Sequence, residues 1–370
     1  MDLSTMSKPF ARKCLEGITS YSPGKPVEEV QREYRLSKVI KLASNENPLG
    51  PSPKALEAVR LALPSLHRYP DGSCFYLVRK LAAHWGVTPE QLIVGNGSDE
   101  IITFAVRAFV EPSDEIVIAH PTFLIYRIAG QLAGAKLRTV PMKDFRYDLA
   151  AMRRAVTRKT KMVFIANPDN PTGSYVTRAE VEAFLEGLDQ KVILFFDEAY
   201  AELADVPDYP DTRRWLAKRP VIIARTFSKA YGLAGLRVGY GLAPRELVEP
   251  MHRVREPFNV NSLAQAAAAA ALDDTEHLEA TRRLLREEKR KLMGALKEMG
   301  FSCVPSATNF ILFHAGPKAG EIAQSLLKKG IIVRHMRAWD LPEYLRVTVG
   351  LAAENDAFIQ TLKPLGRERA

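Results

Sequence analysis

Short apolar runs rich in Val, Ile and Phe alternate along the first two thirds of the chain with segments of helical periodicity. Apolar runs of this length are typical of buried strands, whereas apolar residues three and four apart indicate amphipathic helices. We expect strands at residues 91–94, 115–119, 135–142, 162–166, 191–196, 221–223 and 238–240. We expect helices at residues 53–63, 75–85, 98–110 and 149–156, and another that begins after Thr177. This alternation predicts an α/β fold with a mainly parallel sheet covered by helices.

The pattern changes after residue 257. An alanine-rich helix is expected at 263–272 and a long charged helix at 276–299. Strands at 309–313, 331–334 and 344–349 and helices at 320–329 and 354–365 then predict a smaller C-terminal α/β domain. We therefore divide the chain into three parts: an N-terminal arm that joins the small domain (1–47), a large domain (48–257) and the small domain (258–370).

Composition and charge narrow the possible partners. The chain has 370 residues, 46% of them hydrophobic and 26% charged, which excludes wholesale disorder. The net charge of +9 comes from basic residues interspersed with acidic ones, as at 282–291, which indicates a solvated helix face rather than a nucleic-acid surface. We expect no nucleic-acid partner and no membrane segment, because no apolar run reaches spanning length.

The cysteines point to a reducing compartment. Cys14, Cys74 and Cys303 are far apart and form no C-x-x-C pair, so we expect neither a disulfide framework nor a metal site. The first twenty residues contain no apolar core of a secretion signal. We expect a cytoplasmic protein.

Polar motifs follow three of the expected strands. Asn170 lies in Asn-Pro-Asp-Asn-Pro-Thr-Gly after 162–166, Asp197 and Tyr200 follow 191–196, and Lys229 lies in Thr-Phe-Ser-Lys after 221–223. The carboxyl ends of parallel strands meet at one edge of a sheet, so we expect these side chains to share a site. A lysine beside hydroxyls and an arginine suits a Schiff-base lysine whose aldehyde partner carries a phosphate, although the turn by itself is equally typical of a solvated loop lysine.

These motifs, in this order, resemble those of the fold-type-I aminotransferases that use pyridoxal 5′-phosphate (PLP), from about Lys41 to Gly350. The resemblance implies a seven-stranded-type sheet and a catalytic set of Lys229, Asp197 and Tyr200. Lys229 would bond to the cofactor and shuttle a proton, and Asp197 would pair with the pyridine nitrogen. Asn170 and Tyr200 would donate to the phenolate oxygen of the ring, and Phe123 would stack on it.

The resemblance also implies a site for the cofactor phosphate. Residues 95–100 read Gly-Asn-Gly-Ser-Asp-Glu and lack the third glycine of a dinucleotide fingerprint. We expect Ser98 to cap the helix that begins there. The phosphate ligands would be Gly97, Ser98, Asp99 (through its N–H), Thr226, Ser228 and Arg237, joined by Tyr69 of the neighbouring chain. A shared site of this kind implies a homodimer.

The substrate end is expected to be cationic. Arg346 matches the late arginine that binds a substrate carboxylate in the family, and Arg334 closes the preceding strand. Tyr21 and Asn47, the latter in Ala-Ser-Asn-Glu-Asn-Pro-Leu-Gly, complete the expected substrate set.

The combined motifs look most like those of the histidinol-phosphate aminotransferases. That resemblance implies exchange of an amino group between L-histidinol phosphate plus 2-oxoglutarate and imidazole acetol phosphate plus L-glutamate, in histidine biosynthesis. One departure is His335, which stands where those enzymes commonly have proline.

Two enzyme alternatives remain open at this point, and two non-enzyme alternatives are disfavoured. An aromatic amino-acid aminotransferase and a threonine-phosphate decarboxylase share most of these motifs. A nucleic-acid binder could use the net positive charge, and a PLP-sensing regulator would need a DNA-reading module, for which the N-terminal arm leaves no room.

Overall fold

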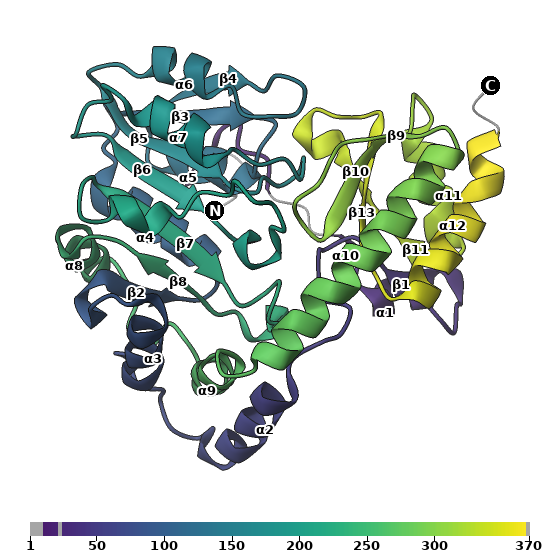
Figure 1. Ribbon diagram of the computed structural model, residues 1–370, viewed down its shortest axis with the longest axis horizontal. Coiled ribbons are helices and arrows are strands. Elements are labelled where there is room, and N and C mark those ends of the chain that lie inside the picture. The colour runs from purple at the N-terminus through teal and green to yellow at the C-terminus, as the bar shows by residue number, and fades with distance from the viewer. Residues whose placement is uncertain (1–9, 21–23, 368–370) are drawn as a thin grey trace, which may run out of the picture.

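A seven-stranded sheet forms the centre of the larger of two packed units (Figure 1). The structure is a computed structural model that describes residues 10–20 and 24–367. The strands of this sheet, in spatial order, are β2 (Leu92–Gly95), β8 (Gly239–Leu242), β7 (Val221–Thr226), β6 (Ile193–Asp197), β5 (Thr160–Ala166), β3 (Glu115–His120) and β4 (Lys136–Pro141). Only β8 runs antiparallel to its neighbours, so the expected mainly parallel α/β fold is confirmed.

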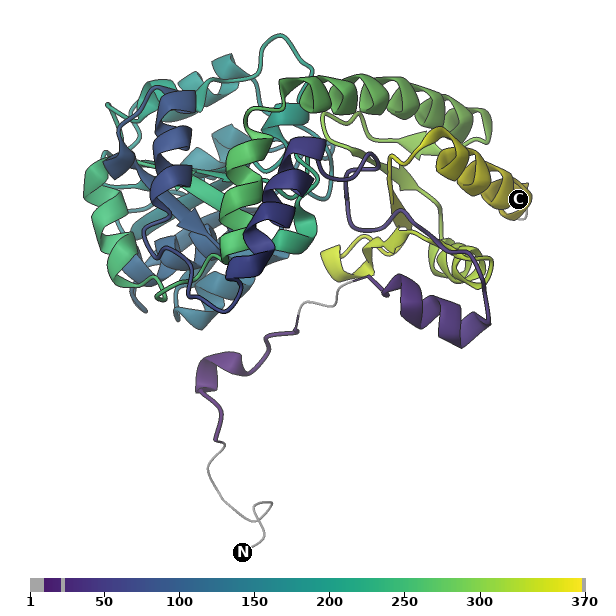
Figure 2. The same cartoon turned by 90° about the horizontal axis from the view of Figure 1, so that it is seen from below.

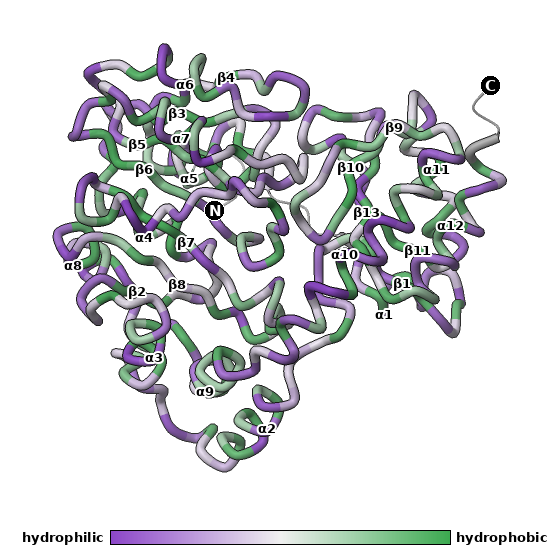
Figure 3. The backbone as a smooth tube through the Cα atoms, in the orientation of Figure 1, coloured by the Kyte–Doolittle hydropathy of each residue, from purple (hydrophilic) through white to green (hydrophobic). Residues whose placement is uncertain are grey.

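Helices cover both faces of this sheet, which explains its continuous apolar strands. Every residue of β6, and nearly every residue of β5 and β7, is buried. Parallel strands buried on both faces read as apolar runs rather than as alternating patterns. Figure 3 shows β5 and β6 as hydrophobic and the surrounding helices as mixed in hydropathy. The helices of this unit are α2 (Pro53–Ala62), α3 (Phe75–Trp85), α4 (Ser98–Phe109), α5 (Leu124–Leu132), α6 (Leu149–Ala155), α7 (Arg178–Leu185), α8 (Arg245–Arg253) and α9 (Ser262–Ala271).

The smaller unit is built on an antiparallel sheet. Its strand order is β12 (Arg334–His335), β13 (Tyr344–Thr348), β10 (Phe310–His314) and β9 (Ser302–Cys303). The helices α10 (Thr275–Glu298), α11 (Ala319–Lys328) and α12 (Ala352–Arg367) pack around it and share one hydrophobic cluster with its strands. Among the described helices, none is long and apolar enough to cross a membrane.

Residues 27–41 of the N-terminal arm pack against the smaller unit, as Figure 2 shows for α1 (Val27–Tyr34). Residues 12–14 lie instead beside α5 of the large unit, where Arg12 Nη2 donates to the Leu132 carbonyl at 3.0 Å. Strand β1 (Ile40–Lys41) pairs in parallel with β11 (Ile331–Ile332), and Val30 of α1 lies in a small cluster with Ala43 and Ile332. Residues 27–43 of the arm are therefore part of the smaller unit.

The two hydrophobic cores do not divide at residue 257, where the sequence suggested a boundary. Helix α9 packs on α2 and α3, and its buried alanines belong to the large core. Helix α10 contributes Leu285 to the large core but Leu292 and Leu296 to the small one. The division between the cores thus falls within α10, between Leu285 and Leu292. Helix α9 stays with the large core because its small alanine side chains allow close packing on α2 and α3.

Candidate active site

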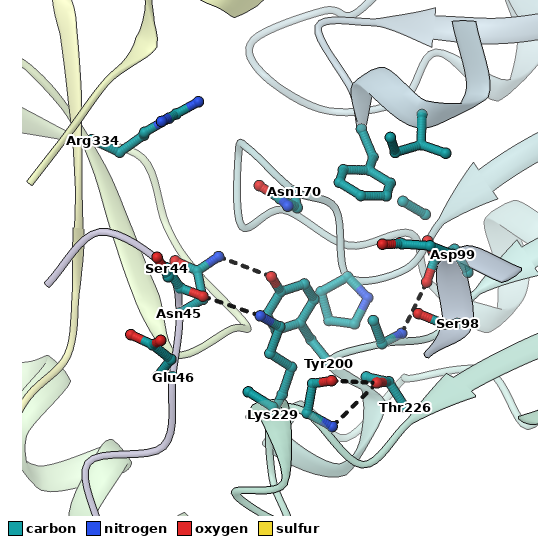
Figure 4. Close-up of a pocket in the computed structure, with 18 of the residues that line it drawn as sticks. Ser44, Asn45, Glu46, Ser98, Asp99, Asn170, Tyr200, Thr226, Lys229 and Arg334 are labelled. Atoms are coloured by element: carbon teal, nitrogen blue, oxygen red, sulfur yellow. Dashed lines mark hydrogen bonds between the residues drawn. The ribbon is translucent and has the colours of Figure 1, made fainter. Parts of the chain in front are cut away.

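One cavity of about 300 Å³ lies between the two units, at the carboxyl edge of the large sheet (Figure 4). Its floor comes from the ends of three neighbouring strands, β7, β6 and β5, and from the segment that follows β3. Its other side comes from residues 43–46 and from the small-domain strands β12 and β13. The expected residues that line it are Ser98, Asp99, Phe123, Asn170, Asp197, Tyr200, Thr226, Ser228, Lys229, Arg237, Arg334 and Arg346.

Lys229 lies at the centre of the cavity, shortly after β7 ends at Thr226. Its Nζ donates to the Ser44 carbonyl at 3.1 Å and lies 5.8 Å from the centre of the Tyr200 ring. Burial, reinforced by the positive charge of Arg346, lowers the pKa of this amine from 10.5 to about 8. A partly buried lysine with a lowered pKa is a nucleophile near neutral pH.

Asp197 ends β6 and is almost fully buried. The Tyr126 hydroxyl donates to its Oδ2 at 2.6 Å, and the Ala199 N–H donates to its Oδ1 at 3.2 Å. Burial raises the pKa of this carboxyl from 3.8 to about 6, against the effect of the Tyr126 hydrogen bond. The Asp197 carboxylate can still accept a hydrogen bond from a donor in the cavity, such as a protonated ring nitrogen.

The N-terminus of α4 and the turn after β7 form a cradle for an anion. Gly97 is the N-cap of α4 and Ser98 its first residue, which corrects the expectation that Ser98 caps the helix. Gly97 takes this place because its φ is +82°, a left-handed conformation that glycine adopts without strain. The Ser228 N–H donates to the Thr226 hydroxyl at 3.1 Å, and Arg237 Nη1 lies 3.4 Å from the Ser228 hydroxyl.

Asp99 belongs to the same cradle and lies 3.7 Å from Arg237 Nη2. Burial raises the pKa of its carboxyl, while the Arg237 charge opposes the shift. One end of the cavity offers hydroxyls, a helix N-terminus and an arginine, and the other end offers the buried Asp197 carboxylate. The partly buried Lys229 amine lies between them. A phosphorylated pyridine aldehyde needs this set of groups. The residues present therefore fit PLP.

Two arginines face this set from the small unit because of their strand register. Arg334 of β12 pairs directly with Arg346 of β13. Arg346 Nη1 donates to the Asn170 side-chain oxygen and Nη2 to the Ala43 carbonyl at 3.1 Å, whereas the Arg334 guanidinium lies 5.2 Å from the Trp339 ring centre. The neighbouring His335 bonds to the Pro342 carbonyl and does not line the cavity.

The sequence matches the family Aminotransferase class I and II over residues 37–362. The chain belongs to this family. It is 46% identical, over 96% of its length and 93% of the relative's, to the histidinol-phosphate aminotransferase of Moorella thermoacetica. It is also 46% identical to histidinol-phosphate aminotransferase 2 of Methylococcus capsulatus, with 98% of both chains covered.

A solved structure agrees with both the fold and the cofactor. The histidinol-phosphate aminotransferase of Sinorhizobium meliloti, in complex with pyridoxal 5′-phosphate, superposes with a TM-score of 0.90 at 30% identity and full coverage of both chains. The expectation of a PLP-dependent fold-type-I aminotransferase is thereby confirmed.

Two expected site residues of this aminotransferase, Tyr69 and Asn47, do not line the cavity of their own chain, and a third is not described. Tyr21 falls outside the described residues. Tyr69 is 83% exposed, stacks on Phe258 at 4.9 Å between ring centres and does not line the cavity. The expectation that Asn47 binds the substrate is corrected, because its amide donates to the Ala230 carbonyl at 2.9 Å and to the Thr281 hydroxyl at 3.1 Å. Asn47 therefore anchors its own loop to α10.

Two residues that the sequence analysis missed take part in the site of this aminotransferase. Asn45, with φ of 56°, turns its side chain into the cavity and donates to the Tyr200 hydroxyl at 2.8 Å. Tyr126 holds Asp197 from α5, and its position three residues after Phe123 could have revealed it, since residues at i and i+3 share a helix face.

Proposed function

We propose that this aminotransferase exchanges an amino group between L-histidinol phosphate and 2-oxoglutarate, giving imidazole acetol phosphate and L-glutamate in histidine biosynthesis. The observation that carries the proposal is the pair of cross-strand arginines, Arg334 and Arg346, facing the same cavity as Lys229. Guanidinium groups bind carboxylates and phosphates through paired hydrogen bonds, and the two substrates carry these two groups. The relatives named above support the choice within the family.

When bound, PLP supplies the carbonyl that carries the amino group and the ring that accepts the electrons of the broken C–H bond. Lys229 would take the proton from the substrate carbon and hold it for its return. Asp197 would keep the ring nitrogen protonated, and Asn170 and Tyr200 would donate hydrogen bonds to the ring oxygen. The α4 N-terminus, with Gly97, Ser98 and the N–H of Asp99, would hold the phosphate together with Thr226, Ser228 and Arg237.

We extend the proposal to a homodimer with shared sites, in which Tyr69 of each chain reaches the phosphate of its neighbour. The exposure of Tyr69 and its place outside the cavity of its own chain support this role. Tyr21 would join Arg334 at the substrate phosphate. The described cysteines are free thiols, which supports work in a reducing cytoplasm.

The test compares donors and arginine variants on the PLP-loaded enzyme. Histidinol phosphate should exceed histidinol in kcat/KM by at least about 10- to 100-fold, because each charge-assisted contact contributes about 1.5–3 kcal/mol. Arg346→Ala should slow the half-reactions of both histidinol phosphate and glutamate, and Arg334→Ala should affect the phosphate substrate more. Arg337→Ala is the matched control, since this nearby arginine is exposed and lies outside the cavity lining.

Other outcomes would move the assignment within the fold. Faster turnover of phenylalanine, or equal turnover of histidinol and its phosphate, would indicate an aromatic aminotransferase. Release of carbon dioxide from threonine phosphate without consumption of 2-oxoglutarate would indicate the decarboxylase.

A further inference from the structure

A fully buried carboxylate, Asp169, lies directly behind the cavity without lining it. It belongs to the loop after β5, and it precedes Asn170, whose amide faces the cavity. Nothing in the reaction described above uses this carboxyl group. An uncompensated buried charge is costly, so the contacts of Asp169 call for an explanation.

The two carboxylate oxygens of Asp169 accept hydrogen bonds from three segments of the chain. Oδ1 accepts from the Thr122 hydroxyl at 2.7 Å and from the Tyr147 hydroxyl at 3.3 Å. Oδ2 accepts from the Thr172 N–H at 3.0 Å and from the Thr172 hydroxyl at 2.8 Å. All four contacts are buried, so one side chain joins the loop after β3 to the loop after β5.

Each of these loops carries a group that faces the cavity. Thr122 immediately precedes Phe123, and one helical turn later Tyr126 donates to Asp197. On the other loop, Asn170 accepts a hydrogen bond from Arg346. The distance between the Phe123 ring and the Asn170 amide is therefore tied to the bonds that Asp169 makes.

We propose that Asp169 is a positioning residue that holds Phe123 and Asn170 in register for the cofactor ring. This inference rests on the proposed cofactor site. Asp169 acts through the two loops and touches neither cofactor nor substrate. Burial raises the pKa of its carboxyl to about 6, so ionised Asp169 lowers the stability of the fold. Such a cost is typical of a residue that is retained to position a functional site.

The chemistry of the donors explains why a carboxylate stands at this position. The Thr172 N–H is a fixed donor, whereas the hydroxyls of Thr122 and Tyr147 can rotate. An asparagine could keep its oxygen on Thr172 and donate to the Thr122 hydroxyl, at the expense of one misdirected hydroxyl hydrogen. An alanine would remove the connection altogether.

The decisive measurement is PLP binding to the apoenzyme, followed by visible absorbance and by the circular dichroism that the protein induces in bound PLP. Asp169→Ala should raise the Kd for PLP by about tenfold or more and weaken the induced signal, since the loss of one buried connection is worth about a factor of ten. Asp169→Asn should restore the Kd to within about threefold of wild type, because its amide fills the same space. Half-reaction rates would be recorded beside the binding data.

The matched control is Glu115, a buried carboxylate at the opposite end of β3. It accepts from Arg138 Nη2 and from the Thr157 hydroxyl, both at 2.7 Å, and lies far along the strand from the cavity edge. Glu115→Ala should lower the melting temperature but leave the Kd for PLP unchanged within about twofold, because it disturbs neither loop.

Two results would overturn the inference: an unaltered PLP Kd and induced signal in Asp169→Ala, or an equal loss of PLP affinity in Glu115→Ala. If Asp169→Ala does not fold, the Kd and induced signal of Asp169→Asn and of Thr122→Val decide, and wild-type values in both would also overturn it. Failure of the wild-type protein to bind PLP would instead contradict the proposed function, so the two failures are distinct.

Discussion

Lys229 and Asp197 show how one buried environment prepares two ionisable groups of opposite charge. Burial disfavours the charged form of each, so the pKa of the Lys229 amine falls to about 8 while that of the Asp197 carboxyl rises to about 6. Both values lie much closer to neutrality than those of free side chains. The apoenzyme therefore presents a partly neutral amine and a largely ionised carboxylate at pH 7, which are the forms that the proposed chemistry requires.

A first prediction follows for the reaction of the apoenzyme with PLP. The neutral fraction of the Lys229 amine grows as pH rises through about 8, so the rate of PLP attachment should rise over the same range. Arg346→Ala should move the midpoint upward, because the Arg346 charge is the second largest cause of the lowered pKa after burial. Stopped-flow absorbance measures the rate, and borohydride reduction with peptide mapping should find the pyridoxyl group on Lys229.

The control for this prediction is Arg334→Ala. Arg334 lines the same cavity but is not among the main charges that act on Lys229, so the midpoint should stay near 8. A midpoint near 10.5 in the wild type, or a pyridoxyl group on another lysine, would contradict the role of Lys229.

The sequence could predict which residue types form the site, but not every side-chain direction. Asp197 and Lys229 follow apolar strands, so the parallel sheet alone brings them to one edge. Asn45 rather than Asn47 enters the cavity because its backbone is left-handed. Asparagine tolerates that conformation, but the sequence does not reveal which of the two asparagines adopts it. The bond from Tyr126 to Asp197 required a helix that was not predicted.

At the scale of elements, each helix that was not predicted from the sequence has a weak local signal. Helix α5 begins beside a site loop and lacks a side-chain cap, α8 contains Pro250, and α1 directly follows the turn residues Gly24 and Pro26. Tertiary packing forms such helices where local signals are weak. By contrast, the capping box of Thr177 and Glu180 gave the start of α7 correctly.

The second prediction concerns the contact between β8 and the N-terminus of α4. A Cβ on Gly239 would lie 2.5 Å from the Ser98 backbone nitrogen and 2.8 Å from the Arg225 carbonyl oxygen, so neither neighbour can yield without moving a main chain. Gly239→Ala should displace the anion cradle and raise the Kd for both PLP and inorganic phosphate, by about tenfold or more. Equilibrium titration of the apoenzyme measures both constants.

Gly235→Ala provides the comparison, because a Cβ at Gly235 would meet no atom within 4 Å. Its affinities for PLP and phosphate should match the wild type. Wild-type phosphate affinity in a folded Gly239→Ala protein would show that the cradle does not depend on this close approach.

At the scale of the whole molecule, exposed apolar side chains gather on one region of the large unit. Leu61, Leu66, Tyr69 and Tyr76 are 57–83% exposed, and they lie at the end of α2, in the segment that joins it to α3, and at the start of α3. Exposed apolar groups in one region are typical of an interface between proteins. Their location beside Tyr69 supports a second copy of this chain as the partner. The domain boundary was harder to place from sequence, because α10 serves both hydrophobic cores.

The third prediction tests the shared site by mixing inactive chains. If Tyr69 serves its neighbour, a hybrid dimer of Lys229→Ala and Tyr69→Ala chains contains one site with both groups intact. Random exchange of equal amounts should restore about a quarter of the wild-type sites, since half the dimers are hybrids with one working site each.

Mixing Lys229→Ala with Asp197→Ala is the control: both residues line the cavity of their own chain, so no hybrid site is complete and activity should stay absent. Recovery in the first mixture alone requires Tyr69 to act across the dimer, whereas no recovery in either mixture would place Tyr69 in its own chain's site or outside the reaction.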